Sequence, residues 1–173
     1  WRTQPEGCSK VVQAINAEAR RSYDEAAGRL GLGGVATLER PGAPLAVEDF
    51  AALRRAGWLV SPVLEGRLPL PGEGVPIRVV GLDLLSAPPS ALPAGLTAIG
   101  PDTPPADLFG PPGLAIASAG TAARLRAAFA GDPAGPEIRA DAAMPPGEVL
   151  SDIVTAERLL GRAGEITRLM VLP

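Results

Sequence analysis

The acidic residues of this chain are its first candidates for chemistry. Asp83 follows a strand-like apolar run, and Asp102 and Asp107 lie in a proline-rich stretch, so carboxylates are available for a metal site or for acid–base hydrolysis. No second group of Asp, Glu or Asn stands at metal-ligand spacing, and the sequence contains no His to act as a base. We therefore expect these residues to lie in solvated loops, and a hydrolase that uses Asp83 or Asp102 is the least favoured function.

Hydroxyl and glycine motifs are the next candidates. Ser118 and Thr121 stand near an expected helix start, where a hydroxyl could hold an anion or act as a nucleophile. Helix capping needs no base and is the preferred role. Gly31, Gly33 and Gly34 resemble part of a phosphate loop, but they follow a helical pattern instead of a strand. We expect them to end a helix.

Large aromatic rings are the remaining candidates, because they make up only 3% of the sequence. Each ring is expected to anchor either packing or a contact with another molecule. The possible anchors are Tyr23, Trp58 and Phe109, and core packing is preferred for Tyr23 and Trp58. No catalytic, cofactor-binding or metal-binding residue is assigned.

Composition limits the function further. A length of 173 residues fits one domain, and a formal charge of −3 with scattered basic residues argues against nucleic acid as a partner. No run of 18 or more apolar residues is present, so no segment is expected to cross a membrane. Residues 1–10 hold the only Lys and the only Cys, and we interpret them as a leader: a tag, a linker or a disordered flank. The domain is expected to span residues 11–173.

The elements that must position any site follow from periodicity and turn residues. An apolar stripe predicts a long amphipathic helix over 11–30, followed by a short strand over 34–40 and a helix over 47–57. Two apolar runs, 58–70 and 75–83, flank a Pro-Gly turn and predict a β-hairpin. Pro62 and Pro69 place the first of these runs at a sheet edge or at bulges.

The second half of the chain is predicted in the same way. Residues 86–112 are rich in Pro, Gly and Ala and are expected to be irregular. Strands are predicted at 114–118, 137–142, 148–153 and 165–173, with helices at 121–131 and 155–161, the latter capped by Thr155 and ended by Gly161. The fold class is therefore α+β: a mixed sheet with a long N-terminal helix and short helices packed on it, with room for two small lobes.

This order of elements resembles the extracytoplasmic domain of FtsX-like, MacB-related permeases of ABC transporters. The resemblance is carried by INAEARRSYDEA in the entry helix, by VSPVLEG, by a hairpin strand ending in VVGLD, and by the closing DIVTAERLLGRAGEITRLMVL. It covers about residues 11–173. In that family the domain sits between the first and second membrane helices, which implies that its two ends lie together at the membrane surface.

The resemblance implies a non-catalytic function in the periplasm or another extracytoplasmic space. It implies pairing with a second permease subunit, a cytoplasmic ATPase that binds the ATP, and a periplasmic partner or a lipoprotein or lipid cargo. The sequence itself has no phosphate loop of the form G-x-x-x-x-G-K-[ST], and no cofactor is expected in this domain. The alternative is a free-standing periplasmic binding module in which residues 86–112 line a pocket for a small molecule or peptide.

Overall fold

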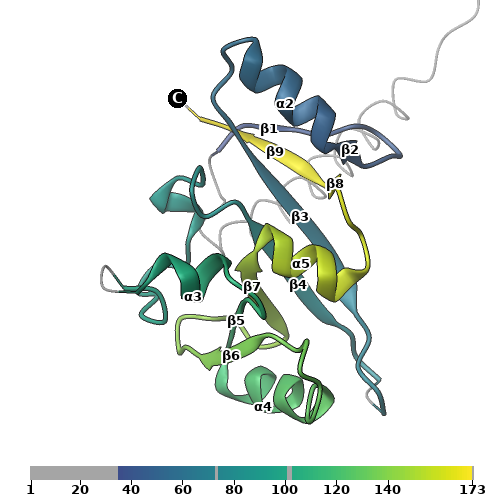
Figure 1. The fold of residues 1–173 in the computed structure, drawn as a ribbon, viewed down its shortest axis with the longest axis vertical. Helices are drawn as coiled ribbons and strands as arrows, with labels where there is room; N and C mark the ends of the chain where they lie inside the picture. The colour runs from purple at the N-terminus through teal and green to yellow at the C-terminus, as the bar shows by residue number, and fades with distance from the viewer. Residues whose placement is uncertain (1–34, 73, 101–102, 173) are drawn as a thin grey trace, which may run out of the picture.

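The computed structural model describes residues 35–72, 74–100 and 103–172, which form a mixed sheet with helices on it (Figure 1). A seven-stranded sheet has the order β1-β9-β3-β4-β7-β5-β6, and a two-stranded sheet pairs β2 with β8. The strands are Thr37–Leu38 (β1), Leu45–Ala46 (β2), Val60–Leu68 (β3), Ile77–Leu82 (β4), Leu114–Ala117 (β5), Glu137–Ala140 (β6), Glu148–Asp152 (β7), Glu165–Ile166 (β8) and Arg168–Val171 (β9).

The helices are short. They are α2 (Val47–Arg55), α3 (Pro105–Phe109), α4 (Ala119–Ala128) and α5 (Ile153–Leu160), with a 3₁₀ turn at Pro89–Ala91. The α+β class, with a mixed sheet and short helices packed on it, is confirmed. The long helix expected over residues 11–30 lies outside the described residues. The large sheet is continuous from β1 to β6, so the described ranges show no division into two lobes.

The predicted hairpin is confirmed as β3 and β4. The two strands are antiparallel, with Val63 opposite Leu82 and Leu68 opposite Ile77, and the Pro-Gly turn between them contains Gly72 at φ 71°. Such a positive φ suits glycine, which has no side chain to clash with the backbone. The hairpin forms the centre of the sheet, since β9 pairs on the other side of β3 and β7 on the other side of β4.

The edge position predicted for the first hairpin strand from its prolines is wrong. Pro62 lies inside β3, which pairs with β9 and β4 on its two sides, and Pro69 follows the end of the strand. The carbonyl of Pro62 accepts a hydrogen bond from the backbone N–H of Asp83, the residue that follows the end of β4. The N and O atoms of a strand residue point to the same neighbour, so the missing N–H of Pro62 faces the point where β4 stops.

Each face of the large sheet has its own apolar core. On one face, α4 and α5 cover a cluster that includes Leu64, Val79 and Leu125. On the other face, the irregular segment after β4 covers a cluster that includes Val63 and Val80. Alternate residues of one strand point to opposite faces, so β3 and β4 contribute apolar side chains to both cores. A third, smaller cluster packs α2 against the part of the sheet near β8.

The irregular structure predicted for residues 86–112 is confirmed, apart from the short helix α3 and the 3₁₀ turn. Asp141, which is only 4% exposed, fastens this segment to the end of β6. Its Oδ2 accepts hydrogen bonds from the backbone N–H groups of Thr97 and Ala98, both at 2.7 Å. Burial alone would raise the pKa of Asp141, but the N–H groups of Ala143, Thr97 and Ala98 outweigh burial and lower it.

Two expectations for the closing segment are wrong. The N-cap of α5 is Asp152, whose Oδ1 accepts from the N–H groups of Val154 at 2.9 Å and Thr155 at 3.1 Å, so Thr155 lies inside the helix. The final strand is divided into β8 and β9, which belong to different sheets and are separated by Thr167. The predicted helix end at Gly161 is confirmed, with φ 64°.

The two ends of the described chain lie side by side. The N–H of Val171 donates to the carbonyl of Ala36 at 2.7 Å, because β1 and β9 are antiparallel neighbours. The N–H of Leu172 donates to the carbonyl of Leu59 at 2.8 Å. The two ends of the described chain, near residues 36 and 172, therefore lie at the same end of the sheet (Figure 1).

Candidate functional site

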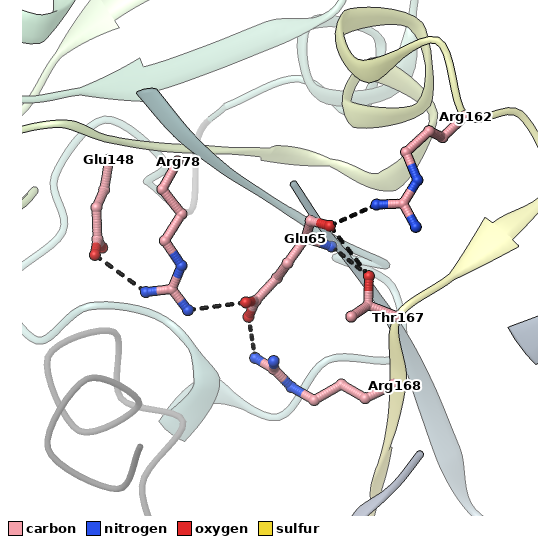
Figure 2. A network of polar contacts seen from close by, with 6 residues as sticks. All are labelled: Glu65, Arg78, Glu148, Arg162, Thr167 and Arg168. Atoms are coloured by element: carbon pink, nitrogen blue, oxygen red, sulfur yellow. Dashed lines mark hydrogen bonds and ion pairs between the residues drawn. The ribbon is translucent and has the colours of Figure 1, made fainter. Parts of the chain in front are cut away.

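A network of charged side chains crosses four neighbouring strands and is shown in Figure 2. Glu65 on β3 accepts from Arg78 on β4, with 2.9 Å between Oε2 and Nη2, and its other oxygen forms an ion pair with Arg168 on β9. Arg78 also donates to Glu148 on β7, with 3.1 Å between Nη1 and Oε1. The network joins the central strands of the sheet into one ionic unit.

The sheet register explains why these side chains meet. Arg78 is directly opposite Glu148 in the parallel β4–β7 pair. Glu65 lies diagonally from Arg78, because Glu65 is opposite Val80, and diagonally from Arg168, because Val63 is opposite Arg168. Long side chains on one sheet face reach their diagonal neighbours. All four charged residues therefore lie on the face that carries Val63 and Val80, opposite α4 and α5.

Electrostatics keep Glu65 ionised. Its burial alone would raise its pKa, but the neighbouring guanidinium groups of Arg168 and Arg78 outweigh burial and lower the pKa. Burial alone would lower the pKa of Arg78, and the carboxylates of Glu65 and Glu148 outweigh it and raise that pKa. A general acid or base at neutral pH needs a pKa near the working pH, so Glu65 is not suited to either role. The network is suited to holding strands together.

The backbone of Glu65 is held as firmly as its side chain. Its N–H donates to Thr167 Oγ1 at 2.8 Å, and its carbonyl accepts from Arg162 Nη1 at 2.8 Å (Figure 2). Thr167 is the residue that separates β8 from β9, and Arg162 follows α5. These bonds fasten the break between the last two strands to the middle of β3.

A cavity of about 380 Å³ lies between the tip side of the hairpin, α4 and α5. Its lining is mostly apolar, with two charged side chains, Arg158 and Asp132. The lining residues are Leu68, Pro69, Leu70, Pro71, Pro112, Ala128, Phe129, Asp132, Ala134, Pro136, Thr155, Arg158 and Leu159. An apolar cavity with a guanidinium at its margin is suited to a small apolar ligand that carries an anionic group.

Close packing fixes α5 beside this cavity. Arg158 Nη2 donates to the carbonyl of Pro112 at 2.6 Å and to Thr155 Oγ1 at 3.2 Å, and Thr155 donates to Asp152. Gly113, at φ 82°, approaches so closely that an added Cβ would stand 1.9 Å from Thr155 Oγ1. Only glycine fits this approach, so the end of the proline-rich segment is tied to α5.

The structure separates the aromatic residues singled out from the sequence. Trp58 follows α2 and is 54% exposed, so the core packing preferred for it is wrong. Phe109 ends α3 and is 37% exposed. Figure 1 shows α2 and α3 well apart, so these two rings do not form one site. Tyr23 lies outside the described residues.

The polar candidates have ordinary local roles. Asp83 accepts from the N–H of Leu85 at 3.1 Å and from Ser86 Oγ, as in a turn. Ser118 occupies the N-cap position of α4 but makes no side-chain bond to its backbone, and Thr121 lies inside the helix, so the capping role preferred for these two residues is wrong. Thr121 accepts from the N–H of Gly147 at 2.8 Å.

The described residues contain no cluster of carboxylates that could bind a metal and no helix that could cross a membrane. Asp102 lies outside that part, as does the side chain of Asp107. Within 35–72, 74–100 and 103–172, no three Cys, Asp or Glu side chains gather as a metal site requires. None of the helices in these ranges combines the length and the apolar character needed to cross a membrane.

Comparison with known proteins adds no relative: no family model, curated protein or solved structure matches this chain. The network around Glu65 was also missed by sequence reasoning. Its signal was present, because Arg78 interrupts the apolar run of β4 and Glu65 ends the apolar run of β3. Charged residues inside otherwise apolar strands indicate either an exposed strand or an ion pair, and the sequence does not distinguish the two.

Proposed function

We propose that this chain is the extracytoplasmic domain of an FtsX-like permease subunit of an ABC transporter. In this function the domain is not catalytic. It contacts a cargo or a periplasmic partner, and it moves when a separate cytoplasmic ATPase drives the membrane helices. The permease acts as a dimer, so a second permease subunit is also a partner.

The observation that supports this proposal is the pairing of Ala36 with Val171. A domain inserted between two consecutive membrane helices must receive the chain and return it at neighbouring points, because packed helices lie about 8–10 Å apart. Neighbouring strands are about 5 Å apart, so the two ends of the described chain, at β1 and β9, lie as close together as this arrangement requires. The resemblance in the closing segment is further support, and that segment runs from Asp152 at the end of β7 through α5, β8 and β9.

The proposal is tested by the side of the membrane on which the domain lies. In the gene product as it occurs, Cys8 and any other cysteine are replaced by Ser, and Val75 at the exposed hairpin tip is replaced by Cys. A membrane-impermeant maleimide should label V75C in intact cells as fully as in lysed cells. Labelling that requires lysis contradicts the proposal, and so does a gene that encodes no apolar span on either side of this domain.

A free-standing binding module is the second candidate, and the cavity beside α5 favours it. Among the described residues of the 86–112 segment only Pro112 lines this cavity, which is formed mainly by the hairpin, α4 and α5. Anilinonaphthalene sulfonate, an apolar anion, is a suitable probe. Saturable binding that Arg158→Gln weakens and Arg158→Lys retains supports a ligand pocket. Equal binding by all three proteins contradicts it.

A further inference from the structure

Four residues form an exposed patch where α2 leads into β3. Arg54 and Arg55 are the last residues of α2, and Trp58 and Leu59 follow the turn at Gly57. Trp58 is 54% and Leu59 52% exposed, and both arginines are exposed. We call these four residues the α2-end patch.

The patch is rigidly placed. The N–H of Trp58 donates to the carbonyl of Leu53 at 3.0 Å, a bond that closes the C-terminal end of α2. The N–H of Gly57 donates to the backbone carbonyl of Arg54 at 3.1 Å. Gly57 has φ 90°, a conformation that turns the chain sharply out of the helix. Two apolar side chains are thus held in water by a defined turn, which costs free energy unless another phase or molecule covers them.

The patch adjoins the two ends of the described chain. Leu59 accepts from the N–H of Leu172, and Val171 is bonded to Ala36. Figure 1 shows the C-terminal end of α2 beside the C-terminus. A membrane helix that follows residue 172 would therefore begin beside the patch.

We propose that the α2-end patch rests on the lipid surface of the membrane. Trp58 and Leu59 lie at the level of the headgroups, and Arg54 and Arg55 face anionic headgroups. This inference rests on the proposed function, because that function returns the chain to the membrane after residue 172. It goes beyond that function by assigning a lipid-binding role to four residues.

Two kinds of complementarity favour lipid as the occupant. Tryptophan is enriched at membrane–water interfaces, because its ring is apolar and its indole N–H stays hydrated. Within the described residues neither Arg54 nor Arg55 has a carboxylate partner, and Arg55 donates only to the carbonyl of Ala51 at 3.2 Å. The positive charges of Arg54 and Arg55 lie next to Trp58 and are complementary to the negative charge of anionic lipid headgroups.

The test uses tryptophan fluorescence of the full 173-residue chain. The sequence has two Trp, so Trp1→Phe leaves Trp58 as the single reporter. A matched control, W1F/W58F/V75W, moves the reporter to the hairpin tip, where Val75 is 71% exposed at the opposite end of β3. Vesicles of phosphatidylcholine and phosphatidylserine carry nitroxide-labelled lipids as quenchers. Quenching of Trp58, stronger with a shallow than with a deep nitroxide, is expected, with no quenching at position 75.

The arginines are tested in the same assay. Each replacement by Gln should weaken partitioning into the anionic vesicles about fivefold and leave partitioning into pure phosphatidylcholine unchanged. Equal quenching of both reporters, or quenching of neither, overturns the proposal, and a blue shift of Trp58 without lipid quenching means that protein covers the patch instead. Unchanged partitioning of R54Q and R55Q refutes the role of anionic headgroups. The maleimide test reports only the side of the membrane, so the proposed function and the lipid contact can fail separately.

Discussion

The ion network gives the sharpest prediction for stability. Glu65→Gln keeps the shape of the side chain but removes the charge that balances Arg168, which is 13% exposed, and part of the balance of Arg78. Removing one partner of a buried ion pair costs about 3–5 kcal/mol. Glu65 retains 16% exposure and Arg78 keeps Glu148, so we expect the free energy of unfolding to fall by about 2–3 kcal/mol at neutral pH.

The effect of Glu65→Gln has a defined pH dependence. The folded-state pKa of Glu65 is below its ordinary value of 4.5, so its stabilising charge is fully present above that pH and is lost as the pH falls through the folded-state pKa. The difference between wild type and E65Q should therefore be constant near neutral pH and shrink in acid. Urea denaturation, followed by circular dichroism at a series of pH values, measures it.

A matched control makes the same chemical change at an exposed pair. Glu137, on the edge strand β6, contacts Arg139 at 2.7 Å and is 53% exposed. Glu137→Gln should change the free energy of unfolding by no more than about 0.5 kcal/mol. The reasoning is refuted if E65Q costs no more than E137Q at neutral pH, or if the cost of E65Q is the same in acid.

Three further predictions concern the elements around the site. Asp152→Ala removes the N-cap of α5 and should lower the free energy of unfolding by about 1 kcal/mol, with Asp152→Asn close to wild type in the same urea titration. Gly81→Ala places a Cβ 2.3 Å from the Cβ of Ala156, so α5 must move. The free energy of unfolding should fall by about 1–3 kcal/mol. The double variant G81A/A156G should recover part of this loss, as measured by thermal unfolding. Asp141→Asn should cost about 2 kcal/mol at neutral pH, because charge-assisted bonds to Thr97 and neighbouring N–H groups are weakened. The lowered pKa of Asp141 means that this cost disappears as the pH falls below its ordinary value of 3.8, and an unchanged cost in acid would contradict the assignment.

Local signals predicted most of the described elements. The hairpin, α2, α4 and the end of α5 were visible because Gly and Pro stand at the turns and because apolar residues follow the strand and helix periods. The helix near residue 121 begins two residues earlier than predicted, at Ala119, which is the usual uncertainty of a helix boundary.

What sequence reasoning missed depends on residues far apart in the chain. Thr167 divides the last strand because it bonds to Glu65, 102 positions away, and no local pattern contains that bond. Pro62 is tolerated inside the sheet only because β4 ends opposite its missing N–H. The ion network combines four strands whose order is set by tertiary pairing, and the exposure of Trp58 follows from a turn that leaves its ring beyond the core.

The position of β9 has a consequence for how the protein is made. β3 is synthesised early, yet its neighbour on one side is the last strand of the sheet, whose residues lie more than 100 positions from their partners in β3, from Val63 opposite Arg168 to Val60 opposite Val171. Until that strand has left the ribosome, the edge of β3 that pairs with it, residues 60–63, stays open to other chains. Folding of this domain is therefore expected to be slow and to be completed only after β9 has been synthesised, with chaperone protection of β3 most important in the interval.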